Sequence, residues 1–172
     1  MAPPPPKHPR EQLTIEGVAV ENYFSPELKV APIIADAVSQ AKEEILFMAF
    51  SFTAEQIGEA MLARAAAGVD VRGVFETVGS SSEYSYYGPM RISELPNIQV
   101  RQDGNRRVMH HKVIILDRET VIFGSFNFSE SANSRNDENY PHHPRSRFCQ
   151  LLRRRVRARL AGRAVGAVGS GQ

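Results

Sequence analysis

Residues 110–127 read HHKVIILDRETVIFGSFN, which is two apolar runs around a short charged segment. Runs of this length, rich in Val and Ile, are typical of buried strands. The pattern predicts one strand over His110–Asp117 and a second over Thr120–Gly124. A tight turn at Arg118-Glu119 would join them into a hairpin.

The chain before this hairpin alternates between strand and helix patterns. Apolar residues at helical spacing between Val30 and Ala41 predict a helix, with Pro32 in its first turn. Further strands are expected at Val18–Phe24, Ile45–Ser51, Val69–Glu76 and Ile98–Arg101, and further helices over 53–67 and near Met90–Leu95. Strands that alternate with helices predict an α/β sandwich around a mixed sheet.

Charge and composition divide the 172 residues into three parts. Residues 1–13 form a Pro-rich lead that is expected to be extended or disordered. Residues 14–140 are the expected catalytic domain, and all 19 Asp and Glu residues of the chain lie within 1–140. Residues 141–172 carry eight Arg and no acid, so they form an Arg-rich tail of different composition. The net charge of +2 therefore says little about the substrate.

The tail has two interpretations. Pro141 and Pro144 predict that no central strand forms there, and the Arg-rich remainder resembles a frame-shifted sequence. Alternatively it is a true basic tail that forms an amphipathic helix able to lie on anionic lipid or nucleic acid. The apolar residues at helical spacing are Phe148, Leu151, Leu152, Val156 and Leu160.

Nothing in the sequence predicts a membrane span or an exported protein. The longest apolar run is six residues, Ile45 to Phe50, whereas a span needs roughly 20. The N-terminus has no apolar segment of a signal peptide. The one cysteine, Cys149, forms no internal disulfide, so a cytoplasmic location is expected.

The hairpin carries a set of side chains suited to phosphodiester chemistry. Residues two apart in a strand share a face, so His110 and Lys112 are expected together and His111 on the opposite face. A histidine beside a lysine supplies a nucleophile or base and a positive charge for phosphate oxygens. Ser125 and Asn127 follow the second strand and would add two donors on one face.

The complete pattern is His-x-Lys, four residues, Asp, six residues, Gly-Ser-x-Asn, and it resembles the HKD signature of the phospholipase D superfamily. The resemblance covers roughly residues 18–139. It extends to residues 49–53 (AFSFT), 68–71 (GVDV) and 136–139 (NDEN), which look like the single-motif bacterial endonuclease branch. It implies a phospholipase D-like fold with one HKD half.

The resemblance also implies a role for each matching residue. His110 matches the nucleophile, which forms a covalent phosphohistidine without a metal or other cofactor. Lys112, Ser125 and Asn127 match the phosphate clamp. Glu138 matches the acid that orients the histidine ring. Asp117 matches the motif aspartate of the catalytic set, and strand alternation away from Lys112 predicts a mainly structural role for it.

The resemblance further implies two facing motifs, whose second histidine protonates the leaving alcohol. Between residues 18 and 139 the only histidines are His110 and His111, on opposite faces. A homodimer with a shared active site would supply the second motif. An upstream HKD domain of a longer parent chain is the alternative source.

Several functional interpretations stay open. The first is a metal-independent nuclease. The second is a phospholipase D that degrades phosphatidylcholine-like or cardiolipin-like lipids, and the third is an inactive phosphate-binding domain. A zinc site would have to use His110, His111, His142, His143 and Cys149, whose spacing fits no common zinc pattern. Phe126 and Phe128 are expected in the core. Base stacking or simple exposure are the alternatives for Tyr84, Tyr86 and Tyr87.

Overall fold

The computed structural model describes residues 10–15, 18–26, 28–104, 107–134, 138–144 and 147–162. They form one eight-stranded sheet in the order β1-β2-β8-β7-β6-β3-β4-β5. Strands β3, β4 and β5 are parallel to one another, and every other neighbouring pair is antiparallel. The expected mixed sheet is therefore confirmed.

The bounds of the elements agree with most of the predicted segments. The strands are β1 Arg10–Ile15, β2 Val18–Ser25, β3 Glu44–Ala49, β4 Asp70–Phe75, β5 Ile98–Gln102, β6 Lys112–Leu116, β7 Thr120–Phe123 and β8 Glu138–Pro144. The helices are α1 Val30–Ser39, α2 Glu55–Ala66, α3 Tyr87–Ile92, α4 Glu130–Ser134 and α5 Arg147–Leu160, with a 3₁₀ turn at Gly79–Ser81.

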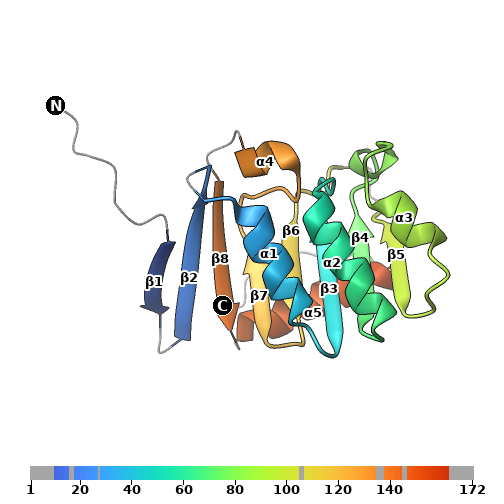
Figure 1. Ribbon diagram of the computed structural model, residues 1–172. Coiled ribbons are helices and arrows are strands. Elements are labelled where there is room, and N and C mark those ends of the chain that lie inside the picture. The colour runs from blue at the N-terminus through green and yellow to red at the C-terminus, as the bar shows by residue number, and fades with distance from the viewer. Residues whose placement is uncertain are drawn as a thin grey trace.

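The sheet lies between two layers of helices (Figure 1). Helices α1, α2 and α3 cover one face, and α5 crosses the other. Every residue of β3 and β6 is buried, as expected for central strands covered on both faces. Phe47 and Ile114 pack under α1 and α2, while Leu46 and Val113 pack under α5.

The hairpin of β6 and β7 turns one residue earlier than predicted. Asp117 and Arg118 both have positive φ, 51° and 63°, and the Glu119 amide donates to the Leu116 carbonyl at 2.9 Å. Two such residues in succession are typical of a type I′ turn, whose twist suits a hairpin. Phe126 and Phe128, which follow the hairpin, are buried in the core as predicted.

The prediction that Pro141 and Pro144 exclude a central strand is wrong. Strand β8 lies between β2 and β7. It pairs with β2 through residues 138–142 and with β7 only through residues 142–144. Each proline therefore lies where β8 has one paired neighbour, as in an edge strand, so the missing amide hydrogen is tolerated.

The expected boundaries at residues 13 and 140 do not interrupt the structure. Strand β1 begins at Arg10, and β8 runs across residue 140. Helix α5 of the Arg-rich tail packs on the sheet through buried Cys149 and Val156, with Leu152 and Leu160 partly buried beside them. Leu151 is 51% exposed, and the side chain of Phe148 lies outside the described part. The tail therefore forms the helix that the spacing predicts, and the apolar stripe of that helix packs on the sheet.

Membrane-spanning helices are absent from the described ranges. None of the helices there has the length and apolar character needed to cross a bilayer.

Candidate active site

His110 and Lys112, the first two residues of the motif, lie at one end of the sheet. Strand β6 is antiparallel to β3 and begins at Lys112, opposite Ala49. His110 and His111 precede β6, so the strand is shorter than predicted, and its pairing with β3 ends at Ala49 and Lys112. One more hydrogen bond, from the Phe50 amide to the His111 carbonyl at 2.9 Å, fixes this segment.

The exposed imidazole of His110 contacts the ammonium group of Lys112, as strand alternation predicts. Lys112 is only 6% exposed, and its Nζ lies 3.0 Å from His110 Nε2. The same Nζ donates to the His110 carbonyl at 3.3 Å. An ammonium group has donors only, so Nε2 accepts from it in the tautomer whose proton is on Nδ1. That is also the tautomer in which Nε2 carries the electron pair that a nucleophile needs.

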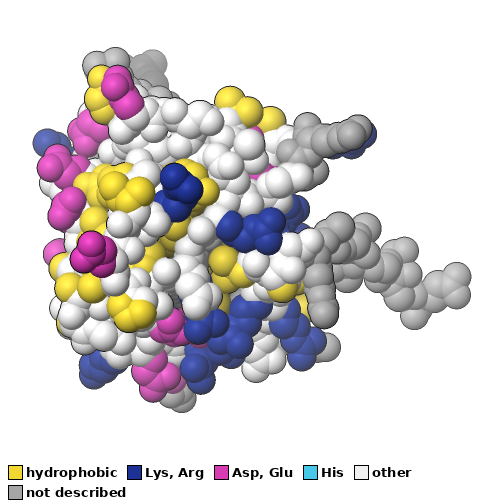
Figure 2. Space-filling model, turned by 90° about the vertical axis from the view of Figure 1, so that its right-hand side faces the viewer, with side chains coloured by type: hydrophobic (Ala, Val, Ile, Leu, Met, Phe, Trp, Pro, Cys, Tyr) yellow, Lys and Arg dark blue, Asp and Glu magenta, His cyan; other side chains and the backbone are white. Residues whose placement is uncertain are grey.

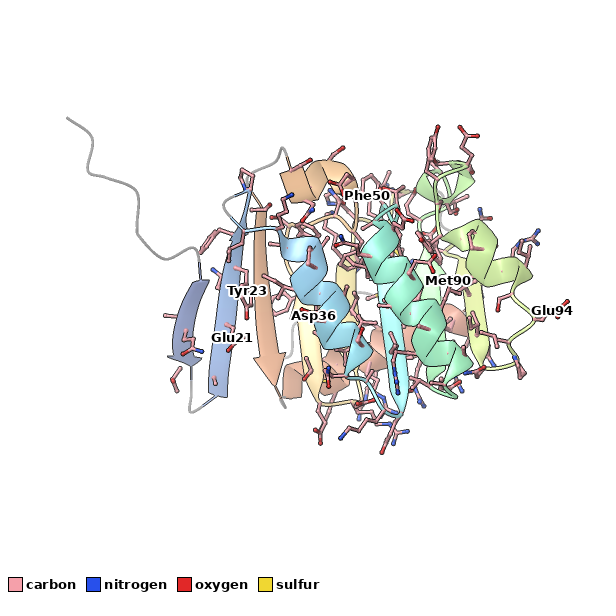
Figure 3. The ribbon with its side chains drawn as sticks, viewed as in Figure 1. Glu21, Tyr23, Asp36, Phe50, Met90 and Glu94 are labelled. Atoms are coloured by element: carbon pink, nitrogen blue, oxygen red, sulfur yellow. The ribbon has the colours of Figure 1, made fainter. Side chains whose placement is uncertain are left out.

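Phe50 completes this cluster, and the sequence did not single it out. Its ring meets the His110 ring edge-on, with centroids 4.7 Å apart, and Lys112 Nζ lies 5.2 Å from its centroid. Phe50 directly follows β3 at the same end of the sheet (Figure 3). Partial exposure beside His110 would have identified Phe50 as a site residue. Neither its exposure nor the strand register that places it there can be read from one sequence.

The segment from Gly124 to Asn127 follows β7 and returns to this same end, because β7 is antiparallel to β6. Gly124 has a φ of 147°, a conformation that favours glycine. Ser125 is exposed and Asn127 half-buried, and they alternate with buried Phe126. Asn127 Oδ1 is buried and, among the described residues, accepts no hydrogen bond.

Glu138 is the first residue of β8 and pairs with Ser25, the last residue of β2. Because β8 is antiparallel to β7, its first residue lies at the end of the sheet where β7 finishes. The backbone of Glu138 is thus at the site end, and its side chain lies outside the described part of the structure.

Asp117 lies at the opposite end of β6 from Lys112. Its carboxylate accepts hydrogen bonds from the backbone amides of Lys42, Glu43 and Glu44 at 2.7–3.0 Å. Burial by itself raises the pKa of Asp117, but these amides and the Lys42 charge outweigh it and lower the pKa. The geometry ties the hairpin turn to the segment before β3 and keeps Asp117 away from His110.

His111 points to the α5 face of the sheet and is half-buried there. Burial lowers its pKa, and the positive charges of Arg159 and Arg155 on α5 lower it further. Its Nδ1 atom is buried and has no hydrogen-bond partner within the described ranges.

The sequence left two alternatives open, a zinc set and the tyrosines of the loop over residues 77–88. The described residues contain no group of three or more His, Cys, Asp or Glu side chains arranged for a metal, and the side chains of His142 and His143 lie outside them. Tyr86 is buried and donates to Glu59, and Tyr87 packs on Phe75, so only Tyr84, 73% exposed, is available for stacking.

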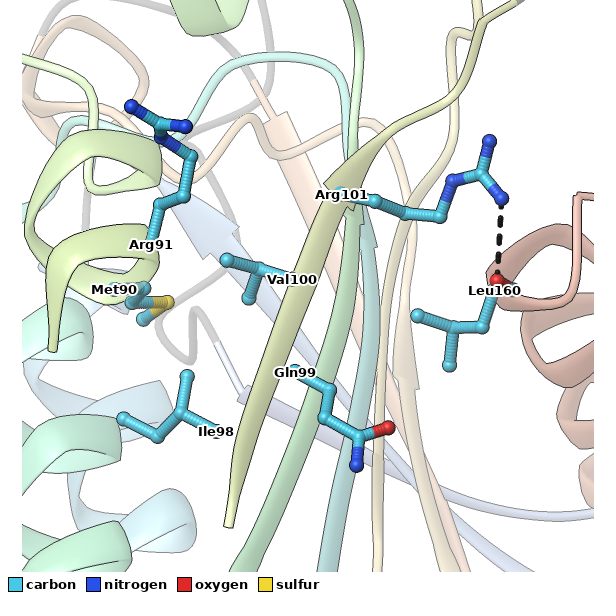
Figure 4. Close-up of a pocket in the computed structure, with 7 residues that line it drawn as sticks. All are labelled: Met90, Arg91, Ile98, Gln99, Val100, Arg101 and Leu160. Atoms are coloured by element: carbon cyan, nitrogen blue, oxygen red, sulfur yellow. Dashed lines mark hydrogen bonds between the residues drawn. The ribbon is translucent and has the colours of Figure 1, made fainter. Parts of the chain in front are cut away.

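A pocket along the edge strand β5 contains none of the motif residues (Figure 4). Its lining residues come from α3, β5 and the end of α5. It is therefore separate from the site of His110 and Lys112.

Three comparisons relate this fold and site to known proteins. The family profile "Cardiolipin synthase, PLD-like domain" matches residues 34–159. A phospholipase D of Rickettsia bellii is 31% identical over 137 residues, which are 79% of this chain and 67% of that protein. The mitochondrial cardiolipin hydrolase of Mus musculus is 32% identical over 60% of this chain and 45% of its own length. Nuc from Salmonella typhimurium, a solved phospholipase D family member, is 32% identical, with a TM-score of 0.75 over 84% of this chain and 95% of that one.

A mixed α/β sheet with a histidine and a lysine in contact at one end defines the class: hydrolases of phosphodiester bonds. The chain belongs to the phospholipase D superfamily. The profile match reaches Arg159, so the family region includes most of α5.

Proposed function

We propose that this chain is a metal-independent nuclease that cleaves phosphodiester bonds through a covalent intermediate on His110. The observation that carries the proposal is the 3.0 Å contact between His110 Nε2 and Lys112 Nζ at an exposed imidazole. It brings the nitrogen that we propose as the nucleophile next to a positive charge that a phosphate oxygen can share.

In the proposed reaction, His110 Nε2 attacks phosphorus and the bond to the leaving oxygen breaks. Lys112, Ser125 and Asn127 donate hydrogen bonds to the nonbridging oxygens, where negative charge gathers. Water then attacks phosphorus, the phosphorus–nitrogen bond breaks, and His110 returns to its neutral form. The second histidine described below, neutral after protonating the leaving oxygen, takes the proton that this water loses. Glu138 is proposed to accept from His110 Nδ1 and orient the ring, and Asp117 to hold the hairpin.

The leaving oxygen needs a proton, which a second imidazolium would supply. His111 faces α5 and lies on the wrong side of the strand for this role. We therefore propose that the second histidine is His110 of an identical chain in a two-fold homodimer. An upstream HKD domain of a longer parent protein is the other source of this group.

Two features support nucleic acid as the substrate. The motif and its flanking segments resemble single-motif bacterial endonucleases, and the match to Nuc extends over 95% of that chain. Hydrolysis of phospholipids is the second candidate, because the rickettsial relatives are named phospholipase D and the mouse relative cardiolipin hydrolase.

One assay tests the proposal. Purified protein is offered single-stranded DNA, RNA, phosphatidylcholine and cardiolipin, all with EDTA present, next to a His110→Ala control. We expect cleavage of nucleic acid by the unmodified chain only. Cleavage of the lipids alone would favour the second candidate, and activity that appears only with a divalent cation would refute the metal-independent mechanism.

A further inference from the structure

Helix α5 carries four of its arginines in two rows, one on each side of its buried stripe. Successive residues of an α-helix are rotated by about 100°. Arg155 and Arg157 directly precede and follow the fully buried Val156, so they project to opposite sides of it. Arg159 lies one turn beyond Arg155, and Arg153 one turn before Arg157. The helix therefore has two flanks: Arg153 and Arg157 form the first, and Arg155 and Arg159 form the second.

The first flank anchors the helix at the end of the sheet away from the active site. Arg157 donates to Glu44 Oε2 at 2.7 Å, and Arg153 to Glu44 Oε1 at 3.1 Å. Glu44 is the first residue of β3, whereas the motif histidine lies where β3 ends. The charges of this flank are therefore used internally, against a carboxylate that is only 3% exposed.

The second flank faces the active-site end. Arg159 Nη1 lies 3.7 Å from the carboxylate of Asp103, which directly follows the site end of β5. Arg101, near that end of β5, donates to the carbonyl of Leu160 at 3.2 Å and holds the last turn of α5 there (Figure 4). Arg155 is on this flank, and its charge, with that of Arg159, contributes to the lowered pKa of His111.

Arg155 has no carboxylate partner in ion-pair contact among the residues that the structure describes. Arg159 shares its charge with Asp103, so Arg155 carries the more available charge of the flank. Figure 2 shows Lys and Arg side chains gathered over the lower part of the α5 side of the molecule, toward the end of the sheet where Arg153 and Arg157 bind Glu44. The flank of Arg155 and Arg159 is named here the α5 shelf. The Arg159–Asp103 contact and the effect of both charges on His111 show that it faces the same end of the sheet as His110.

We propose that the α5 shelf, mainly through Arg155, binds the phosphate backbone of a nucleic-acid strand. The bound phosphate would lie on the α5 face of the sheet, while the scissile phosphate lies at His110 on the other face. The inference rests on the proposed nuclease function. A nucleic-acid strand carries a phosphate on every nucleotide, so one phosphate can occupy the shelf while another is held at His110 and Lys112. Arg suits this role because its guanidinium forms paired hydrogen bonds with phosphate oxygens.

The α5 shelf gives the substrate its direction across the molecule. The strand would pass from the His110 face of the sheet, over the end of β6, to the α5 face beside His111. A lipid headgroup inserted from a membrane would not need a positive charge on this second face. Binding of anionic vesicles through Arg155, instead of nucleic acid, is the competing outcome of the test.

The test measures binding of a short single-stranded DNA to chains that carry His110→Ala to prevent cleavage. Arg155→Ala is compared with Arg155→Lys, and with Arg154→Ala as the matched control. Arg154 is on the same helix and exposed, but it lies two residues before Val156 and so projects away from the sheet. Circular dichroism and thermal melting establish that all variants are folded.

We expect Arg155→Ala to weaken binding several-fold at low salt and to reduce the slope of log K against log salt by about 0.7, the value for one lost phosphate contact on a single strand. Arg155→Lys should keep the slope, and Arg154→Ala should leave it unchanged.

Other results would overturn the inference. An unchanged slope in Arg155→Ala would do so, as would equal losses in Arg154→Ala, which would indicate diffuse attraction. If the chain with intact His110 still cleaves DNA in either case, the proposed function stands without the shelf. If that chain cleaves no nucleic acid and the parent binds only anionic vesicles, both proposals fail.

Discussion

Replacing Glu44 with Gln tests whether the Arg-rich helix is part of the folded core. Glu44 is 3% exposed and receives Arg157 at 2.7 Å, Arg153 at 3.1 Å and Arg118 at 3.3 Å. Glutamine keeps the volume and one acceptor oxygen but removes the charge. Its amide group would also place a donor against arginine donors.

The expected cost follows from these three contacts. A hydrogen bond to a charged group contributes about 1.5–3 kcal/mol, against about 0.5–1.5 for a neutral one, so each contact loses roughly 1 kcal/mol. The side chains of Arg153, Arg157 and Arg118 are 26%, 47% and 52% exposed, so water replaces part of this loss. We expect the free energy of unfolding to fall by about 2 kcal/mol, which lowers Tm by roughly 4–8 °C in a chain of this size.

The assay is urea and thermal unfolding of Glu44→Gln beside Glu43→Gln, whose side chain is exposed on the neighbouring residue. The control should stay within about 0.5 kcal/mol of the parent.

Burial by itself would raise the pKa of Glu44, but the hydrogen bond from Arg157, the charges of Arg153 and Arg157, and the hydrogen bond from Arg118 lower it overall. The stabilisation is therefore complete above the ordinary glutamate pKa of about 4.3 and is lost as pH falls through the folded-state value. Equal stability of the two variants, or a difference that grows at acid pH, would refute the docking of α5 through Glu44.

Three further predictions concern the motif. His110→Ala should abolish turnover while His111→Ala retains it, and acid-quenched enzyme should carry labelled phosphate on His110; an essential His111 with a dispensable His110 would reverse the assignment. Mixing excess His110→Ala chains with unmodified chains should lower activity per unmodified chain as mixed dimers form, and a fully active monomer in sedimentation would end the shared-site proposal. Asp117→Asn should lower stability by about 2 kcal/mol at neutral pH, because the charge that receives three backbone amides is lost. Since the pKa of Asp117 is lowered in the fold, this difference should shrink as pH falls through the folded-state value, and a pH-independent difference would argue against the carboxylate.

Local patterns were sufficient to predict the hairpin and the meeting of His110 with Lys112. Strand periodicity is a property of neighbouring residues, so one sequence contains it. The same reasoning failed for β8, because whether Pro141 loses a ladder bond depends on which neighbours pair beside it. The docking of α5 also escaped prediction. Arg153 and Arg157 reach a carboxylate 109 and 113 residues earlier in the chain, and no local pattern reports that distance.

The spacing of the motif follows from the dimensions of the hairpin. Lys112 and Asp117 are five residues apart, and at about 3.3 Å per residue β6 spans roughly 17 Å between the site end and the far end of the sheet. After the turn, β7 returns the chain to the site end, where Gly124 begins the segment of Ser125 and Asn127.

We therefore expect Asp117 to influence the proposed chemistry only through the rigidity of this hairpin. The far end is fixed twice by one short segment: the amides of residues 42–44 hold Asp117, and the Glu44 carboxylate holds α5. The hairpin that carries Lys112 and the helix that carries Arg155 thus share one anchor. Loosening that anchor should displace the proposed phosphate clamp and the proposed α5 shelf together, although neither contacts it.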